Sequence, residues 1–138
     1  MFLFQPKPKR QLIGFEDMKI AIQKPSQYII INTFEQDVVI KNTVRDADEE
    51  RIINEQLNNY KSPDLPIIVY GRNSCDTSVE QKQTQLATLG FTEIYIYAGG
   101  LFEWLLLQDV YSADEFPTTN QIPIDILRYR PKASASFV

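Results

Sequence analysis

Histidine is absent from this chain of 138 residues, and cysteine occurs only once, as Cys75. Without histidine, the chain cannot use the Ser-His-Asp or Cys-His arrangements that activate a nucleophile. A single cysteine excludes an internal disulfide, and no histidine–cysteine cluster is left to bind zinc. We therefore expect no metal site and no cofactor, and a reducing intracellular compartment such as the cytoplasm.

Long apolar runs and excess positive charge are also missing. No apolar run, Trp104–Leu107 and Ile94–Ala98 included, exceeds five residues, far short of the roughly 20 residues that span a bilayer. The first ten residues place their positive charges after the apolar ones, which is not the order of a secretory signal. Fourteen Lys and Arg face 18 Asp and Glu, for a net charge of −4. We therefore expect neither a membrane nor a nucleic acid as a partner.

Short β-branched apolar runs alternate with longer amphipathic segments along the chain. The runs predict strands, buried on both faces, at residues 28–31, 67–70 and 94–97, with a shorter strand candidate at 38–40. The longer segments predict helices at residues 15–23, 46–60, 79–89 and 99–110. This alternation predicts an α/β fold with a central, mainly parallel sheet that is flanked by helices on both faces.

The composition indicates one globular domain with two extensions. Apolar residues make up 43% of the chain, which suffices for a core in a single domain of this length. We assign residues 1–11 to an extended N-terminal arm, 12–110 to the domain and 111–138 to a C-terminal extension. The extension is expected to pack in part and then become flexible, and its packing residues are expected to be Ile122, Ile124, Ile126, Leu127 and Tyr129.

The polar loop that follows the strand at 67–70 is the candidate site. In a parallel α/β sheet, ligands bind at the carboxyl ends of strands, where a loop leads into a helix. The amides of such a loop, together with the helix N-terminus, favour an anion. The residues predicted to bind an anion or substrate are Gly71, Arg72, Asn73, Ser74, Asp76, Thr77 and Ser78.

The same loop has a purely structural interpretation. Asp, Thr and Ser are common helix caps. Thr77 with Glu80, and Ser78 with Gln81, match the spacing of two overlapping capping boxes. Capping alone therefore accounts for the composition of the second half of the loop.

Cys75 is the candidate catalytic residue because it lies in this loop, just before a helix. A thiol beside a helix N-terminus ionises more readily and can become a nucleophile. Arg72 would strengthen this effect and Asp76 would oppose it. A lone cysteine can equally be an inert loop residue, so both interpretations stay open.

Three sequence elements, taken in order, resemble the core of rhodanese-like domains. They are Val69-Tyr70-Gly71-Arg72, Leu89-Gly90-Phe91, and Gly99-Gly100 with Trp104. That family commonly shows Val-Tyr-Cys-Arg, a helix ending in Leu-Gly-Phe or Leu-Gly-Tyr, a strand, and Gly-Gly-x-x-x-Trp. With the strand at 28–31 as the family's first core strand, the resemblance covers residues 12–110. It implies a single rhodanese-like domain with an atypical active-site loop.

The departures from the family pattern bear on activity. The resemblance implies that active members have a cysteine directly after the strand and that this cysteine carries a persulfide. In this chain the corresponding residue is Gly71. Arg72 is retained, whereas Asp76 or Thr77 stands where a second loop arginine is expected. A related phosphatase loop is excluded because Gln81 takes the place of its arginine. The first hypothesis is therefore a non-catalytic binding or assembly module, with a protein as its partner.

The alternative hypothesis is a sulfurtransferase that carries the persulfide on Cys75 and takes sulfur from a small anionic donor such as thiosulfate. A third interpretation is a sensor whose Cys75 is oxidised without turnover. The aromatic-rich segment Phe102–Phe116 is a candidate partner surface.

Overall fold

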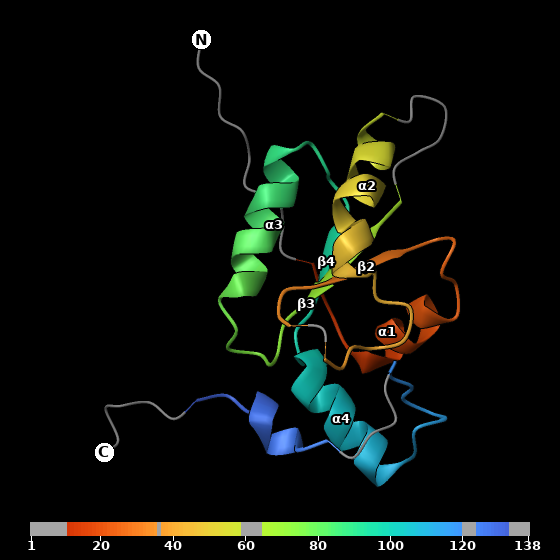
Figure 1. Ribbon diagram of the computed structural model, residues 1–138, viewed down its shortest axis with the longest axis vertical. Coiled ribbons are helices and arrows are strands. Elements are labelled where there is room, and N and C mark those ends of the chain that lie inside the picture. Colours follow the sequence, from red (N-terminus) through yellow and green to blue (C-terminus); the bar gives the residue numbers. More distant parts are fainter. Residues whose placement is uncertain (1–10, 36, 59–64, 120–123, 133–138) are drawn as a thin grey trace.

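The computed structural model describes residues 11–35, 37–58, 65–119 and 124–132. Four parallel strands form one sheet in the order β1-β4-β3-β2. The strands and helices alternate along the chain (Figure 1), with these bounds: β1 Gln11–Ile13, α1 Phe15–Ile22, β2 Ile29–Asn32, α2 Asp46–Leu57, β3 Ile67–Tyr70, α3 Ser78–Thr88, β4 Ile94–Tyr97, α4 Gly100–Val110 and the short 3₁₀ helix η1 Ile126–Tyr129.

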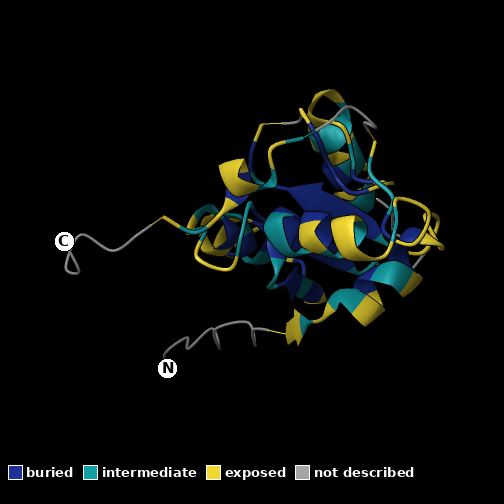
Figure 2. Cartoon of the chain, turned by 90° about the horizontal axis from the view of Figure 1, so that it is seen from below, coloured by how far each residue is buried: buried dark blue, intermediate teal, exposed yellow. Residues whose placement is uncertain are grey.

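Both faces of the sheet are covered, as the sequence predicted. One face packs against α1 and α4 through Met18, Leu101 and Trp104, all with no exposed surface. The other packs against α2 and α3 through residues that include Ile53 and Leu86. Side chains of successive strand residues alternate between the two faces. Figure 2 accordingly shows a largely buried sheet, with exposed residues on the outer sides of the helices, in the loops and in β1.

The predicted helix boundaries differ from the observed ones by a residue or two where the structure describes them. The helix expected at 46–60 is α2, which ends at Leu57, and residues 59–60 lie outside the described part. Gly90 follows α3 with a φ of 108°, and the amide of Phe91 returns to Leu86 O at 3.2 Å. This left-handed residue closes the helix as the sequence predicted.

Two strand assignments need correction. Residues 38–40 are buried but form no strand, because the only ladder contact there is an isolated antiparallel bridge between Ile40 and Thr118. Conversely, Gln11–Ile13 form an unpredicted strand that pairs with Tyr95–Tyr97 of β4. A segment forms a strand only where its backbone can hydrogen-bond to a neighbouring strand. Residues 11–13 have such a neighbour in β4, whereas residues 38–40 form a single bridge.

The C-terminal extension packs in part. Tyr129 is 2% exposed, and Ile124 and Ile126 lie against the core beside α1 and α4. Leu127, in contrast, is 57% exposed. Residues 1–10, Ile122 and residues 133–138 lie outside the described residues. Within the described ranges, no helix combines the length and apolar character that crossing a membrane requires.

Candidate functional site

The candidate loop, residues 71–77, leaves the carboxyl end of β3 and enters α3 (Figure 1). β3 lies between β2 and β4, and all four of its residues are buried. The loop is therefore attached to a central, fully buried strand of the sheet, where the sequence predicted the site.

Gly71 is packed so tightly that a side chain there would force its neighbours to shift. A Cβ added at this position would lie 2.7 Å from Val79 Cγ2 and 2.8 Å from Asp76 Oδ2. Both distances are shorter than ordinary carbon contacts. The constraint is steric and comes from the start of α3, so the first loop position accepts glycine alone unless its neighbours move.

The carboxylate of Asp76 lies between the start of the loop and the start of α3. Its Oδ2 accepts the backbone N–H of Arg72 at 2.9 Å. Its Oδ1 accepts the backbone N–H and the hydroxyl of Ser78, at 3.1 and 2.6 Å. The side chain is only 10% exposed. A negative group of the chain itself thus occupies the N-terminus of α3, which is where the sequence predicted an anion.

These contacts decide how the helix is capped. Asp76 caps α3, whereas the residue directly before the helix, Thr77, makes no side-chain capping bond. The Ser78 hydroxyl contacts Asp76 and, at 2.6 Å, Thr33 Oγ1. The structural interpretation of Asp76 is therefore confirmed, and the two predicted capping boxes are wrong. The two carboxylate oxygens of an aspartate point in different directions, so Asp76 can accept the Arg72 amide with one and the Ser78 amide with the other.

Hydrogen bonding keeps Asp76 ionised. Burial raises the pKa of its carboxyl. Hydrogen bonds from the Arg72 amide and from the Ser78 hydroxyl and amide lower it, as does the charge of the Arg72 guanidinium, and together they outweigh burial. The net pKa lies below the ordinary value of 3.8. At neutral pH the loop therefore holds a permanent negative charge.

Arg72 is already engaged by carboxylates. Its guanidinium lies 2.9 Å from Glu35 Oε2 and 3.7 Å from Asp76 Oδ2, and it sits 5.7 Å above the ring of Phe34. The hydrogen bond from Arg72, followed by its charge, lowers the pKa of Glu35. Glu35 was not singled out by the sequence, and no local signal could have found it, because it lies 37 positions away.

Asn73, another loop residue, forms its hydrogen bonds within the chain. Asn73 Oδ1 accepts the backbone N–H of Cys75 at 2.9 Å, and its Nδ2 donates to Tyr129 O at 2.9 Å. Cys75 itself is exposed, with Ser74 Oγ 4.0 Å from its sulfur. Sequence reasoning also missed Tyr129 as a loop neighbour, although it expected that residue to pack.

The start of α4 closes the other side of the loop. The amides of Leu101 and Phe102 donate to the carbonyl oxygens of Gly71 and Arg72, at 3.0 and 2.8 Å. Gly100 makes this approach possible, since its φ is 66° and a Cβ there would lie 2.7 Å from Gly71 O. The turn at Gly100 therefore brings the start of α4 against the candidate loop.

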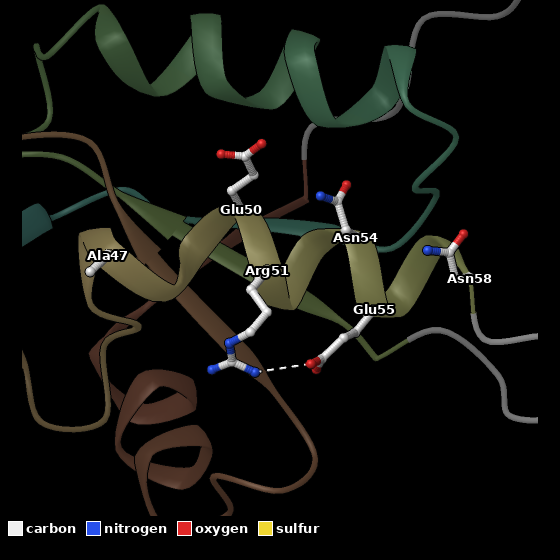
Figure 3. Close-up of a pocket in the computed structure, with 6 residues that line it drawn as sticks. All are labelled: Ala47, Glu50, Arg51, Asn54, Glu55 and Asn58. Carbon is white, nitrogen blue, oxygen red and sulfur yellow. Dashed lines mark hydrogen bonds and ion pairs between the residues drawn. The ribbon is translucent and has the colours of Figure 1, made fainter.

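Two hollows lie near α2. One is on the outer surface of that helix and is lined by α2 residues and the residue after it; Figure 3 shows Arg51 paired with Glu55 along the helix, at 2.9 Å. The other, here called the α2–α3 groove, has a volume of about 390 Å³ and reaches Ser78, the residue of α3 that directly follows the candidate loop. The residues lining this groove are Asn32, Thr33, Phe34, Asp46, Glu49, Ser78, Gln81, Lys82 and Gln85.

The chemistry open to the loop is limited. The amides of Arg72, Cys75, Asp76, Ser78 and Val79 already donate to acceptors of the loop itself. Within the described part of the chain, no group of three or more His, Cys, Asp or Glu side chains is arranged to hold a metal ion. The loop can present an exposed thiol and a paired arginine, while several of the amides that could bind an anion are in use.

Comparison with known proteins places the fold. The family model described as "Rhodanese-like domain" matches residues 25–107, which is more than half of the chain. A search of the curated proteins finds no match.

Solved structures share the fold at low identity. A Lactobacillus plantarum protein has a TM-score of 0.58 at 20% identity and covers 79% of this chain and 87% of its own. The BH2092 protein of Bacillus halodurans has a TM-score of 0.53 at 17% identity, covering 70% and 72%. The Saccharomyces cerevisiae single-domain sulfurtransferase RDL2 has a TM-score of 0.52 at 19% identity, covering 83% and 100%. Because the family model covers residues 25–107, the chain belongs to the rhodanese-like domain family.

Proposed function

We propose that this chain is a non-catalytic rhodanese-like module, a pseudoenzyme that binds a protein partner. Gly71 stands in place of the nucleophilic cysteine that the family resemblance implies. The observation that carries the proposal is the Asp76 carboxylate, which accepts the amides of Arg72 and Ser78 at 2.9 and 3.1 Å. An internal anion in that position competes directly with an incoming one.

The steric state of the loop supports the same proposal. Active members need a side chain at the position of Gly71, but a Cβ there would lie within 2.9 Å of both Asp76 and Val79. The glycine and the aspartate therefore fit each other. Together they form an alternative packing of the loop in which the carboxylate replaces the bound anion.

Electrostatics also disfavours an anionic sulfur donor. The net charge of the chain is −4, and the loop arginine, Arg72, lies against Glu35 and Asp76. A negatively charged surface lowers the encounter rate of an anion such as thiosulfate. A partner with positive or neutral groups is favoured instead, and a reducing cytoplasm suits the single exposed cysteine.

The alternative is a sulfurtransferase that acts through Cys75, and its exposure within the loop favours this reading. The thiolate would attack the outer sulfur of thiosulfate and form a Cys–S–S⁻ persulfide. Sulfite would leave with the electron pair of the broken S–S bond. Such a persulfide would compete with internal acceptors for the amides of Arg72, Cys75 and Asp76, which is why we rank this reaction second.

Intact mass spectrometry after incubation with thiosulfate separates the two functions. We expect no gain of one sulfur on the wild type or on Cys75→Ser, with the yeast sulfurtransferase RDL2 as the positive control. A gain on the wild type that disappears in Cys75→Ser would overturn the proposal and establish Cys75 as a carrier. Prior titration of the free thiol ensures that Cys75 is reduced in the sample.

A further inference from the structure

The α2–α3 groove is a polar hollow between two neighbouring helices, next to the candidate loop. α2 and α3 lie side by side over the same face of the sheet (Figure 1). The groove draws on three parts of the fold: the end of β2 with the residues that follow it, α2 and α3. Its volume of about 390 Å³ is within the range of small-ligand pockets.

The lining of the groove selects for polar ligands. Thr33 and Ser78 supply hydroxyls, and Gln81 and Gln85, one helical turn apart on α3, supply exposed amides. Phe34, the one large apolar side chain in the lining, is buried. A ligand that offers only apolar surface would leave these groups without water and without a partner, which is costly.

The charges of the groove favour a cation. Two carboxylates, Asp46 and Glu49, and a single ammonium, Lys82, line it, so its formal charge is −1. Glu49 and Lys82 form an ion pair across the groove at 2.8 Å, with side chains only 26% and 20% exposed. This pair demonstrates, within the chain, that Glu49 accepts an ammonium in a largely covered setting.

We propose that the α2–α3 groove binds a positively charged side chain or amine, with Glu49 as the carboxylate that receives it. The cation joins or displaces Lys82 beside Glu49, while the amides of Gln81 and Gln85 hydrogen-bond the polar part of the ligand. The inference rests on the proposed binding function and names the chemistry of its partner: a lysine or arginine of a protein, or a free primary amine.

The first test is a titration of the full-length, ¹⁵N-labelled protein with capped tripeptides, followed by backbone amide shifts. The peptides carry lysine, arginine, norleucine or glutamate between two glycines. We expect saturable shifts at Glu49, Ser78 and Lys82 with the two cationic peptides and none with the others. Absence of localised shifts, or equal shifts with norleucine, would overturn the inference.

Two substitutions should move the affinity in opposite directions. Glu49→Gln removes the receiving charge and should weaken binding by about tenfold, the effect of one hydrogen bond to a charged group. Lys82→Met removes the competing ammonium and should tighten binding. Glu50→Gln, the same change one position along α2 and outside the groove lining, is the matched control and should have no effect. Unchanged spectra elsewhere establish that each variant is folded, and unchanged affinity in folded Glu49→Gln contradicts the assignment.

n-Butylammonium distinguishes the two sources of the cation. If it saturates the same amides as tightly as the lysine peptide, the ligand is a free amine; tighter peptide binding indicates a protein partner. Both outcomes support a cation site. If no cationic probe binds, the assignment of the groove as a cation site is wrong. The proposed lack of sulfur transfer would be unaffected, because intact mass spectrometry tests it separately.

Discussion

Replacing Asp76 tests whether the candidate loop depends on its internal carboxylate. Asp76→Ala leaves the backbone N–H groups of Arg72 and Ser78 without their acceptor. The lost N-cap is worth about 0.5–2 kcal/mol, and leaving a buried donor without an acceptor costs about 1–3 kcal/mol. Water can reach part of the site, because the Asp76 side chain is 10% exposed. We therefore expect a loss of about 2–3 kcal/mol in the free energy of unfolding.

Urea denaturation of the wild type, Asp76→Ala and Asp109→Ala measures this effect. Asp109 is an exposed aspartate on α4, so its replacement should change stability by less than about 0.5 kcal/mol. A loss for Asp76→Ala no larger than that of the control would refute the reasoning, since the carboxylate would then contribute nothing to the loop.

The pH dependence of stability in the wild type and Asp76→Asn gives a second measure of Asp76. Its pKa is lower in the folded chain than its ordinary value of 3.8. The stability it contributes is therefore present above the unfolded pKa and is lost as the pH falls through the folded pKa. The difference in unfolding free energy between the wild type and Asp76→Asn should be constant above about pH 5 and shrink toward pH 2. A difference that stays the same over this range would contradict an ionised, hydrogen-bonded carboxylate.

Three further substitutions follow from packing and hydrogen bonding. Gly71→Ala should destabilise by about 1–3 kcal/mol, because its Cβ would lie 2.7 Å from a neighbouring carbon; in Gly14→Ala the nearest atom is at 3.7 Å and the loss should be smaller. Gln83→Met should stabilise by about 1 kcal/mol, since its Nε2 is the one buried side-chain polar atom without a partner among the described residues. Tyr70→Phe should cost about 1–3 kcal/mol, because the hydroxyl accepts the amide of Ile40 at 3.0 Å in the core. Urea midpoints check all three, and a stable Gly71→Ala, a destabilised Gln83→Met or a neutral Tyr70→Phe would each contradict the contact named.

The position of the candidate loop could be read from the sequence, but its chemistry could not. The run Ile67–Tyr70 and the glycine after it mark the end of a buried strand, because periodicity and turn residues are local signals. Which loop residue would cap α3 was ambiguous, since Asp76, Thr77 and Ser78 all have suitable side chains. Backbone geometry selects among them, and that geometry includes contacts from α4 to the carbonyls of Gly71 and Arg72.

The sequence by itself determined the α/β class, the three main strands, the four helices and the glycine that ends α3, because propensity and periodicity act within a few residues. Only the tertiary structure decided that β1 is a strand and that residues 38–40 are not, since a strand exists by pairing with a distant neighbour. It also decided that Glu35 meets Arg72 and that Glu49 meets Lys82 across the α2–α3 groove. Charges separated by more than 30 positions leave no local pattern, because their energy depends on distance in space and not along the chain.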